Sequence, residues 1–236
     1  MKKVVALAAL LPLALAVPCL HAQSTSFGTY GDTSVVSGPG GTPVFQLTSN
    51  PSLQGYSGIY VQFNSAFTAS DLTNLSADFD MTQNTITNGA PRFSIIDTTN
   101  NSQNEAYVFF GTPAGGGTFT DPTPGSWENT GNVVDSTDLI VQNNGFGGGS
   151  TGASYETWAQ FLSQEGTTNI GYITIDVDGG FGSTQTADVN NFDVNGTLFN
   201  APAAAATPEP SSLLLLGSSL FGAAEVLRRR RKTSSL

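Results

Sequence analysis

The chain has 236 residues, of which 39% are hydrophobic and 11% are charged, and its formal net charge at pH 7 is −10. Of its 8 Lys and Arg residues only Arg92 lies between Gln23 and Thr207, whereas 16 of its 18 Asp and Glu residues lie there, so this body carries −15. Nucleic acid and anionic membrane surfaces repel such a body, which excludes both as its partners.

The residue types that the body lacks exclude several kinds of site. The single Cys and the single His are Cys19 and His21, and residues 23–207 contain no Cys, His or Lys. Disulfides, zinc sites built on Cys or His, and Ser-His-Asp or Cys-His nucleophiles are therefore excluded. We expect no enzyme activity and no cofactor, with calcium as the one metal for which suitable oxygen ligands remain.

Residues 1–22 have the three parts of a secretory signal peptide. Lys2 and Lys3 supply the positive start, residues 4–17 are apolar and uncharged, and Ala22 is the small residue before the expected cut. An apolar stretch of 14 residues is shorter than the roughly 20 that a bilayer span needs. We expect the general secretion machinery to export the chain and signal peptidase to cleave after Ala22.

Residues 23–200 are expected to form one all-β domain, a single β-sandwich with one short helix. Apolar and polar side chains alternate over residues 75–82, 171–177 and 192–198, which is typical of strands with one buried face. Further strands are expected at residues 59–63, 92–96, 106–110 and 139–142. Segments rich in Gly, Pro, Asn and Asp separate them and favour turns.

One segment of the body has helical rather than strand periodicity. Its large apolar side chains recur at helical spacing: Tyr155, Trp158, Phe161 and Leu162. Ser154 is the expected N-cap, and Glu156 falls in the first turn. The pattern predicts a short helix that packs across the end of the sandwich, with Trp158 in the core.

Parts of the body also resemble, loosely, the jelly-roll β-sandwich domains of extracellular bacterial proteins. The matching pieces are residues 90–93, 106–111, the helix around Trp158, 175–180 and 189–194. Because such sandwiches include lectins, enzymes and passive modules, the resemblance implies a jelly-roll-like fold class and no particular function.

The C-terminal region divides into a linker, a short motif, an apolar stretch and a basic tail. Residues 201–207 are the linker, Pro208, Glu209 and Pro210 form the motif, and residues 211–227 are mostly apolar. At 1.5 Å per residue, a helix of these 17 residues would be about 25 Å long, close to the thickness of a hydrocarbon core. The basic tail, residues 228–236, begins with five consecutive cations: Arg228, Arg229, Arg230, Arg231 and Lys232. The positive-inside rule keeps that tail on the cytoplasmic side.

This order of motif, apolar helix and basic cluster resembles the PEP-CTERM sorting signal of Gram-negative bacteria. The resemblance implies an exosortase, a membrane transpeptidase, as partner, with cleavage near Pro208. It also implies that the body is held transiently at the inner membrane, facing the periplasm, before transfer to the cell surface or the extracellular space. Such substrates are typical of species that make exopolysaccharide. Glu225 departs from the usual apolar span and weakens the anchor.

Two kinds of binding site are open to the body. Asp176, Asp178 and Asp188 could supply oxygen ligands for calcium, although a turn after a strand is the better explanation of Asp178 and Gly179. Trp127 lies among turn residues and is the candidate aromatic platform for a sugar ring. Arg92 could clamp a uronic acid or could pair with an internal Asp.

The remaining candidates are weaker. Three tyrosines are further possible sugar contacts: Tyr56, Tyr60 and Tyr107. The four glutamates of the body are expected on the solvated surface: Glu105, Glu128, Glu156 and Glu165. We therefore expect an exported, non-catalytic surface or matrix protein that associates with exopolysaccharide. A carbohydrate-active enzyme with a carboxylate pair, or a calcium-dependent adhesin, is the alternative.

Overall fold

The computed structural model describes residues 25–49, 55–83, 91–97, 104–110, 124–148, 155–178 and 184–203. The expected signal peptide, most of the linker and the C-terminal stretch 208–236 lie outside these residues. In the part of the chain that is described, no helix is both long and apolar enough to cross a membrane.

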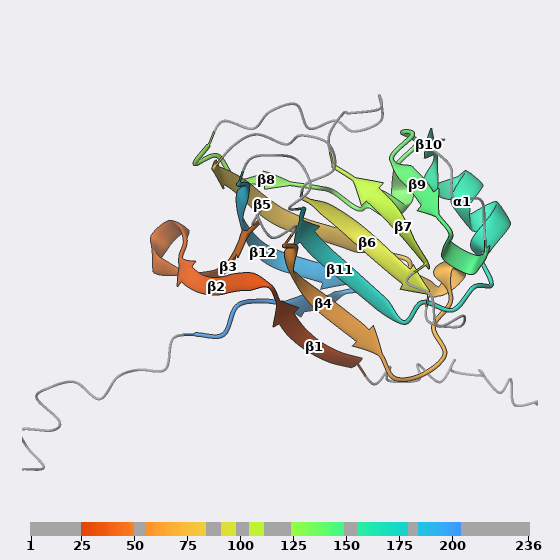
Figure 1. The fold of residues 1–236 in the computed structure, drawn as a ribbon, viewed down its shortest axis with the longest axis horizontal. Helices are drawn as coiled ribbons and strands as arrows, with labels where there is room; N and C mark the ends of the chain where they lie inside the picture. The colour runs from red at the N-terminus through yellow and green to blue at the C-terminus, as the bar shows by residue number, and fades with distance from the viewer. Residues whose placement is uncertain are drawn as a thin grey trace, which may run out of the picture.

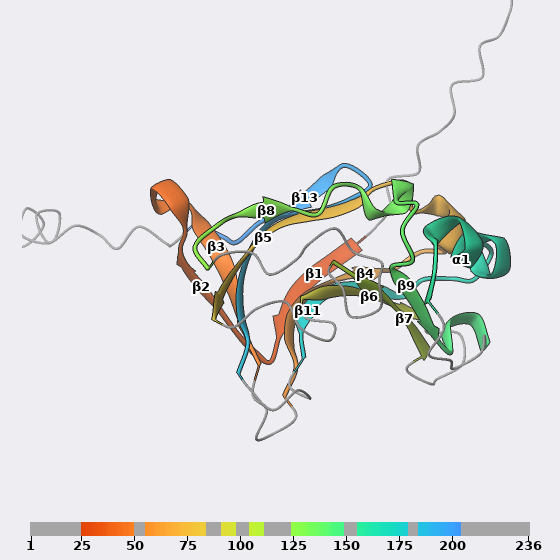
Figure 2. The ribbon, with the colours of Figure 1, turned by 90° about the horizontal axis from the view of Figure 1, so that it is seen from above.

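The described residues form two antiparallel sheets packed face to face, which confirms the predicted β-sandwich (Figures 1 and 2). The seven-stranded sheet contains, in spatial order, β1 (Thr25–Tyr30), β4 (Ser57–Phe63), β11 (Tyr172–Val177), β6 (Arg92–Asp97), β7 (Asn104–Phe109), β9 (Val141–Asn144) and β10 (Tyr155–Glu156). The six-stranded sheet contains β2 (Asp32–Ser37), β3 (Pro43–Thr48), β12 (Thr186–Val194), β5 (Leu75–Gln83) and β8 (Glu128–Asn129), with β13 (Thr197–Phe199) also paired to β12.

Apolar side chains from the inner faces of both sheets form one continuous core. Phe93 on β6 meets Phe192 on β12 at a ring separation of 5.9 Å and Phe110 at 4.7 Å. Phe79 on β5 completes this group at 5.4 Å from Phe110. All four rings are buried, and aromatic contacts of this kind join the sheets across the sandwich.

The first two strands belong to different sheets, and the chain passes between the sheets at Gly31. This residue has φ +66°, and a Cβ there would lie 2.0 Å from the carbonyl oxygen of Tyr56. The backbone N–H of Asp32 then donates to Ser57 Oγ, which in turn donates to the carbonyl of Thr48. A side chain at position 31 is therefore excluded by both conformation and space.

The predicted strand at residues 192–198 is wrong in one respect, because the chain turns back within it. Asn195 and Gly196 both have positive φ, 52° and 82°, and they connect β12 to β13 in a tight hairpin. Asn195 Oδ1 also accepts from the backbone N–H groups of Thr73 and Asn74, and this ties the hairpin to the start of β5. The Asn-Gly pair between two apolar runs is a hairpin signal that the alternation concealed.

The predicted helix exists but starts later than expected. The helix α1 spans Trp158–Glu165 and lies at one end of the sandwich, while Tyr155 and Glu156 form β10 (Figure 1). Its N-cap is Thr157, whose hydroxyl accepts from the backbone of Gln160, and the Gln160 side chain returns a bond to the backbone N–H of Thr157. This reciprocal capping box fixes the start of the helix, so the prediction of Ser154 as N-cap is wrong.

Four single-turn 3-10 helices complete the described fold: Pro39–Gly41, Ala69–Asp71, Val133–Asp135 and Phe146–Gly148. They lie in connections between strands. Phe146 and Phe161 of α1 pack together at 5.4 Å, and Trp158 is almost fully buried, as the sequence predicts. These contacts attach the helix to the main core rather than to a separate one.

Candidate functional site

The outer face of the seven-stranded sheet, which points away from the six-stranded sheet, carries a group of interacting polar side chains that is largely buried. This sheet curves, and its outer face lies on the inside of the bend (Figure 2). On β11, Thr174 and Asp176 point to this face while Ile173 and Ile175 enter the core. The predicted alternation of β11 is therefore correct, but its polar residues are buried too.

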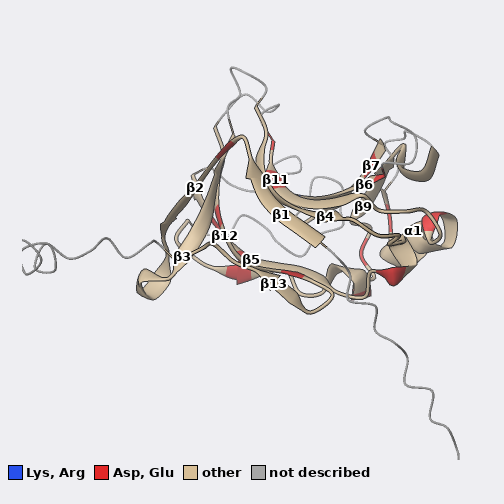
Figure 3. Cartoon of the chain, turned by 90° about the horizontal axis from the view of Figure 1, so that it is seen from below, with Lys and Arg blue, Asp and Glu red and all other residues tan. Residues whose placement is uncertain are grey.

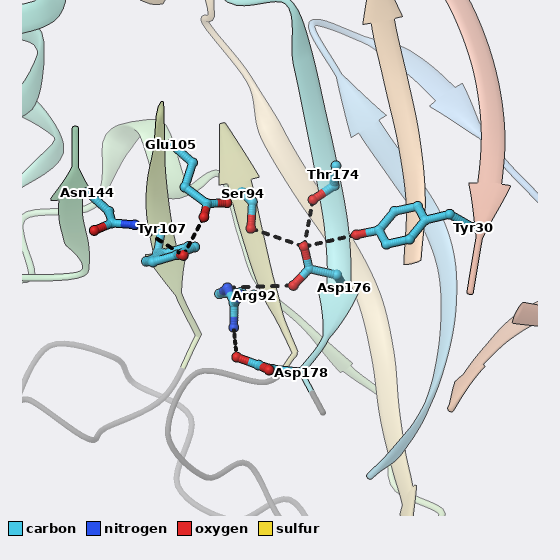
Figure 4. Close-up of polar contacts among 9 residues, drawn as sticks. All are labelled: Tyr30, Arg92, Ser94, Glu105, Tyr107, Asn144, Thr174, Asp176 and Asp178. Atoms are coloured by element: carbon cyan, nitrogen blue, oxygen red, sulfur yellow. Dashed lines mark hydrogen bonds and ion pairs between the residues drawn. The ribbon is translucent and has the colours of Figure 1, made fainter. Parts of the chain in front are cut away.

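Asp176 is the centre of the polar group (Figure 4). Its Oδ2 accepts hydrogen bonds from the hydroxyls of Thr174, Ser94 and Tyr30, at 2.7, 3.0 and 3.2 Å. Its Oδ1 lies 3.5 Å from Arg92 Nε, which is an ion pair without hydrogen-bond geometry. A carboxylate held by this many partners is fixed in position and keeps its charge away from solvent.

Tyr30 reaches Asp176 from β1, across the intervening strand β4. The tyrosine ring passes over Gly58 of β4, where a Cβ would lie 2.6 Å from the Tyr30 hydroxyl oxygen. Burial, followed by the negative charge of Asp176, raises the pKa of Tyr30 well above its usual value. The hydroxyl therefore stays protonated and acts as a donor, which ties the edge strand β1 to the centre of the sheet.

Arg92 lies between two carboxylates and is itself buried, with 5% of its surface exposed. Its Nη1 donates to Asp178 Oδ2 at 3.0 Å, and its guanidinium carbon lies 4.4 Å from the centre of the Tyr107 ring. Burial acts to lower the pKa of Arg92, but Asp176 and Asp178 outweigh it and raise the pKa above its usual value. Of the two roles that the sequence left open for Arg92, the structure has the internal ion pair.

A third carboxylate, Glu105 on β7, lies next to this group. The Tyr107 hydroxyl donates to Glu105 Oε1 in a short hydrogen bond and accepts one from Asn144 Nδ2. Burial raises the pKa of Glu105, even though the bond from Tyr107 and the charge of Arg92 act to lower it. Burial also raises the pKa of Tyr107, followed by the effect of Glu105. Glu105 is thus half-buried and engaged rather than freely solvated.

Exposed and half-exposed tyrosines surround the polar group. Tyr56 precedes β4 and is 50% exposed, and the pKa of its hydroxyl is raised chiefly by the charge of Asp178. Tyr60 and Tyr172, from the paired strands β4 and β11, contact each other edge to face at 6.1 Å. A tyrosine ring with one exposed face can pack against the CH groups of a sugar ring.

The structure does not bring together the two predicted glycan contacts, Trp127 and Arg92. Arg92 is on β6 of the seven-stranded sheet, whereas Trp127 comes directly before β8 in the six-stranded sheet and is half-buried. Tyr56 and Tyr107 do lie near Arg92, as their electrostatic and ring contacts show. Sugar contact by Tyr56, Tyr60 or Tyr107 stays a prediction, and no spacing along the chain indicates that these tyrosines share a face with Arg92 but not with Trp127.

The predicted calcium ligands are divided between the sheets. Asp176 and Asp178 are paired with Arg92, while Asp188 lies on β12 and accepts a hydrogen bond from Gln46 at 3.0 Å. Within the described ranges, no three His, Cys, Asp or Glu side chains are grouped so that they could hold a metal. Calcium binding by these three residues stays a prediction, and residues 179–183, which follow Asp178, lie outside the described residues.

The environment of Asp188 leads us to expect that the stability of the fold depends on pH. It lies directly opposite Asp80 on β5, and burial, followed by the charge of Asp80, raises its pKa. A carboxyl whose pKa is raised by folding destabilises the fold as the pH rises from about 4 through that raised pKa. We expect Asp188→Asn, whose amide oxygen can still accept from Gln46, to raise the melting temperature at pH 7.

The gain from Asp188→Asn should shrink as the pH falls towards 4, because folding raises the pKa of Asp188 and a growing share of this carboxyl in the unmodified protein is then protonated. Differential scanning calorimetry from pH 4 to pH 8 measures both. A gain of equal size at both ends of that range would show that packing, and not ionisation, causes it.

The prediction that all four body glutamates are solvated is wrong for Glu165. This residue ends α1, is buried, and accepts a hydrogen bond from Thr168 Oγ1 at 2.9 Å. Glu156 accepts from Gln164 at 2.6 Å and remains nearer the surface. Asp and Glu residues lie on both sheets of the described fold (Figure 3).

Several members of the polar group were missed by reasoning from the sequence. Tyr30, Ser94 and Thr174 each donate a hydrogen bond to Asp176 but come from three separate strands. Ser94 and Thr174 are directly opposite each other in the β6–β11 pairing. Only that register reveals the group, since no spacing within the chain connects these residues.

The fold and the matching sequence motif together define the class of this protein: an all-β sandwich with a C-terminal sorting signal. A family model described as the PEP-CTERM protein-sorting motif matches residues 206–232, which confirms the predicted resemblance. This motif is the recognition signal for exosortase and implies export through the cell envelope to the surface. A comparison with curated proteins found no match.

Two solved structures are similar to parts of the chain. One is an exo-β-agarase, with 14% identity and a TM-score of 0.35, matched over 75% of this chain and 24% of the agarase chain. The other is the xyloglucanase domain of NopAA, a type three effector from Sinorhizobium fredii, in complex with cellobiose. It has 16% identity and a TM-score of 0.31, over 73% of this chain and 97% of that domain. The chain spans about a quarter of the agarase. At these TM-scores, neither structure indicates the fold or the function of this chain.

Proposed function

We propose that the exported body is a non-catalytic protein that binds extracellular polysaccharide on the outer face of the seven-stranded sheet. The observation that carries this proposal is the exposed ring of Tyr56 beside the buried polar group, together with Tyr60 and Tyr172 on the same face. A rigid sheet with aromatic rings next to fixed hydrogen-bonding groups suits a flat, repetitive ligand such as a glycan chain. The sorting motif recognised by exosortase supports a location outside the cell, where such a glycan is found.

Two features support binding rather than catalysis at this face. Asp176 is buried and its two oxygens are engaged by three hydroxyls and Arg92, so it is poorly placed to attack a substrate. Glycoside hydrolysis needs a second carboxyl about 5–9.5 Å away that can exchange a proton with the substrate. Glu105 is a nearby carboxyl whose pKa is raised by burial, but its Oε1 is already bonded to Tyr107.

The role of Tyr56 can be tested on the processed protein purified from cells that export it. We expect Tyr56→Ala to weaken binding to the producer's own exopolysaccharide by about 2- to 12-fold, the loss that an aromatic contact of about 0.5–1.5 kcal/mol produces. Tyr56→Phe keeps the ring and should retain most of the affinity. Because Tyr56 is half exposed, the free energy of unfolding should change little. Affinity electrophoresis and urea titration provide the two measurements.

Trp127→Ala is the matched comparison, since Trp127 directly precedes β8 of the six-stranded sheet. Weakened binding in Trp127→Ala with no change in Tyr56→Ala would place the glycan on the six-stranded sheet and contradict the proposal. New reducing ends after incubation with the polysaccharide, abolished by Glu105→Gln, would favour the carbohydrate-active enzyme instead.

A further inference from the structure

The charged groups on the outer face of the seven-stranded sheet have an excess of negative charge. Arg92 is the one cation among them, and it is buried between Asp176 and Asp178. Glu105 adds a third carboxylate next to Tyr107, whose ring already stacks on the Arg92 guanidinium. When Arg92, Asp176, Asp178 and Glu105 are all ionised, these four groups carry a net charge of −2. The positive charge of Arg92 is neutralised by its ion pairs with Asp176 and Asp178.

The residues of the body that lie outside the described ranges cannot reverse this sign. Between Gln23 and Thr207 the sequence contains no Lys, no His and no Arg other than Arg92. The undescribed residues of this body therefore contain no cation, and Asp121 is the only carboxylate among them. The negative sign of the face therefore follows from the sequence and the position of Arg92 together.

The negative charge also extends to the part of the face that a ligand can reach. The hydroxyl of the exposed Tyr56 has a raised pKa chiefly because of the charge of Asp178. Glu105 is half-buried, so its carboxylate lies close to solvent. The protein on its other side screens the negative charge only weakly. Tyrosine ring faces such as those of Tyr56, Tyr60 and Tyr172 attract cations through their quadrupoles.

We propose that this face selects glycans by charge and that its ligand is a polysaccharide with protonated amino groups, whereas chains of uronic acids are excluded. The inference rests on the proposed glycan-binding function and specifies its substrate class. An ammonium group near Glu105 and the tyrosine rings gains a favourable interaction, and a uronate there meets the same groups with the opposite sign. Arg92 cannot serve as a clamp for a uronate, because both neighbouring aspartates already hold it.

The experiment compares three hexasaccharides on the processed protein: glucosamine hexamer, N-acetylglucosamine hexamer and galacturonic acid hexamer. Isothermal titration calorimetry at pH 6 in low salt and at 0.3 M NaCl measures each affinity. We expect the glucosamine hexamer to bind about fivefold or more tighter than the neutral hexamer in low salt, and the ratio to fall at high salt. The galacturonic acid hexamer should bind weakest.

Two variants separate a site effect from the overall charge of the body. Glu105→Gln should lower the ratio of glucosamine to N-acetylglucosamine affinity, whereas Glu128→Gln removes the same charge from the six-stranded sheet and should leave the ratio unchanged. An equal drop in both variants would show a general charge effect and overturn the proposed selectivity. Tightest binding of the galacturonic acid hexamer, or equal affinities for the first two sugars, would overturn it as well. If none of the three hexamers and no native exopolysaccharide binds, the proposed function itself fails.

Discussion

Arg92→Met is expected to lower the free energy of unfolding by about 3–5 kcal/mol, the cost of removing one partner from a buried ion pair. The change leaves Asp176 and Asp178 buried without their cation, although Asp176 keeps its three hydroxyl donors. It also removes the cation from the face of Tyr107. Urea unfolding at pH 7 of the variant and the unmodified protein measures the loss.

Two further measurements decide whether unpaired charge causes the loss from Arg92→Met. The combined variant Arg92→Met with Asp176→Asn and Asp178→Asn has no unpaired carboxylate and should recover much of the lost stability. The single variant should also regain stability as the pH falls, because protonation removes the charge from the unpaired carboxylates. A loss below about 1 kcal/mol, or one that is the same in the combined variant, would contradict the ion-pair explanation.

Phe93→Ala is expected to cost about 3–5 kcal/mol, the range for truncating a buried phenylalanine. Its ring contacts Phe110 and, across the sandwich, Phe192 on the facing sheet. A cavity at that point removes contacts on both sides, and the flanking strands are held by the hydrogen bonds of the sheet and cannot close it. Thermal unfolding and urea titration measure the effect.

Phe93→Leu is the control for this position, because it keeps most of the apolar volume and should cost clearly less than Phe93→Ala. Phe93 and Arg92 are adjacent on β6 but point to opposite faces. Their two losses should therefore differ in pH dependence, with only that of Arg92→Met changing with pH. A pH-dependent loss in Phe93→Ala would mean that the core and the polar face are coupled.

The sequence predicted the central strands well because their inner faces are apolar at every second residue. In β5, Leu75, Ala77, Phe79 and Met81 are all fully buried, as the alternation requires. The edge strands β1 and β2 escaped prediction, since they are rich in Thr, Ser and Gly and bury little apolar surface. Weak burial leaves weak periodicity, so such strands have no clear signal in one sequence.

The sequence also placed two boundaries wrongly, in both cases because local hydrogen bonds outweighed periodicity. The capping box at Thr157 starts the helix three residues after the predicted cap, and the Asn195-Gly196 turn breaks what looked like one strand. Both signals were present as short motifs. They were concealed because the apolar spacing continues across them.

By itself, the sequence determined the sorting motif, the all-β class and the sign of the charge on the body, because these depend on composition and on contiguous residues. The matched motif at residues 206–232 is of this kind. Only the tertiary structure decided that Arg92 is neutralised by Asp176 and Asp178, and that Tyr30 and Tyr56 lie on the same face as Glu105. The physical reason is strand register: antiparallel pairing brings distant residues together and assigns each side chain to one face, and no spacing along the chain encodes that choice.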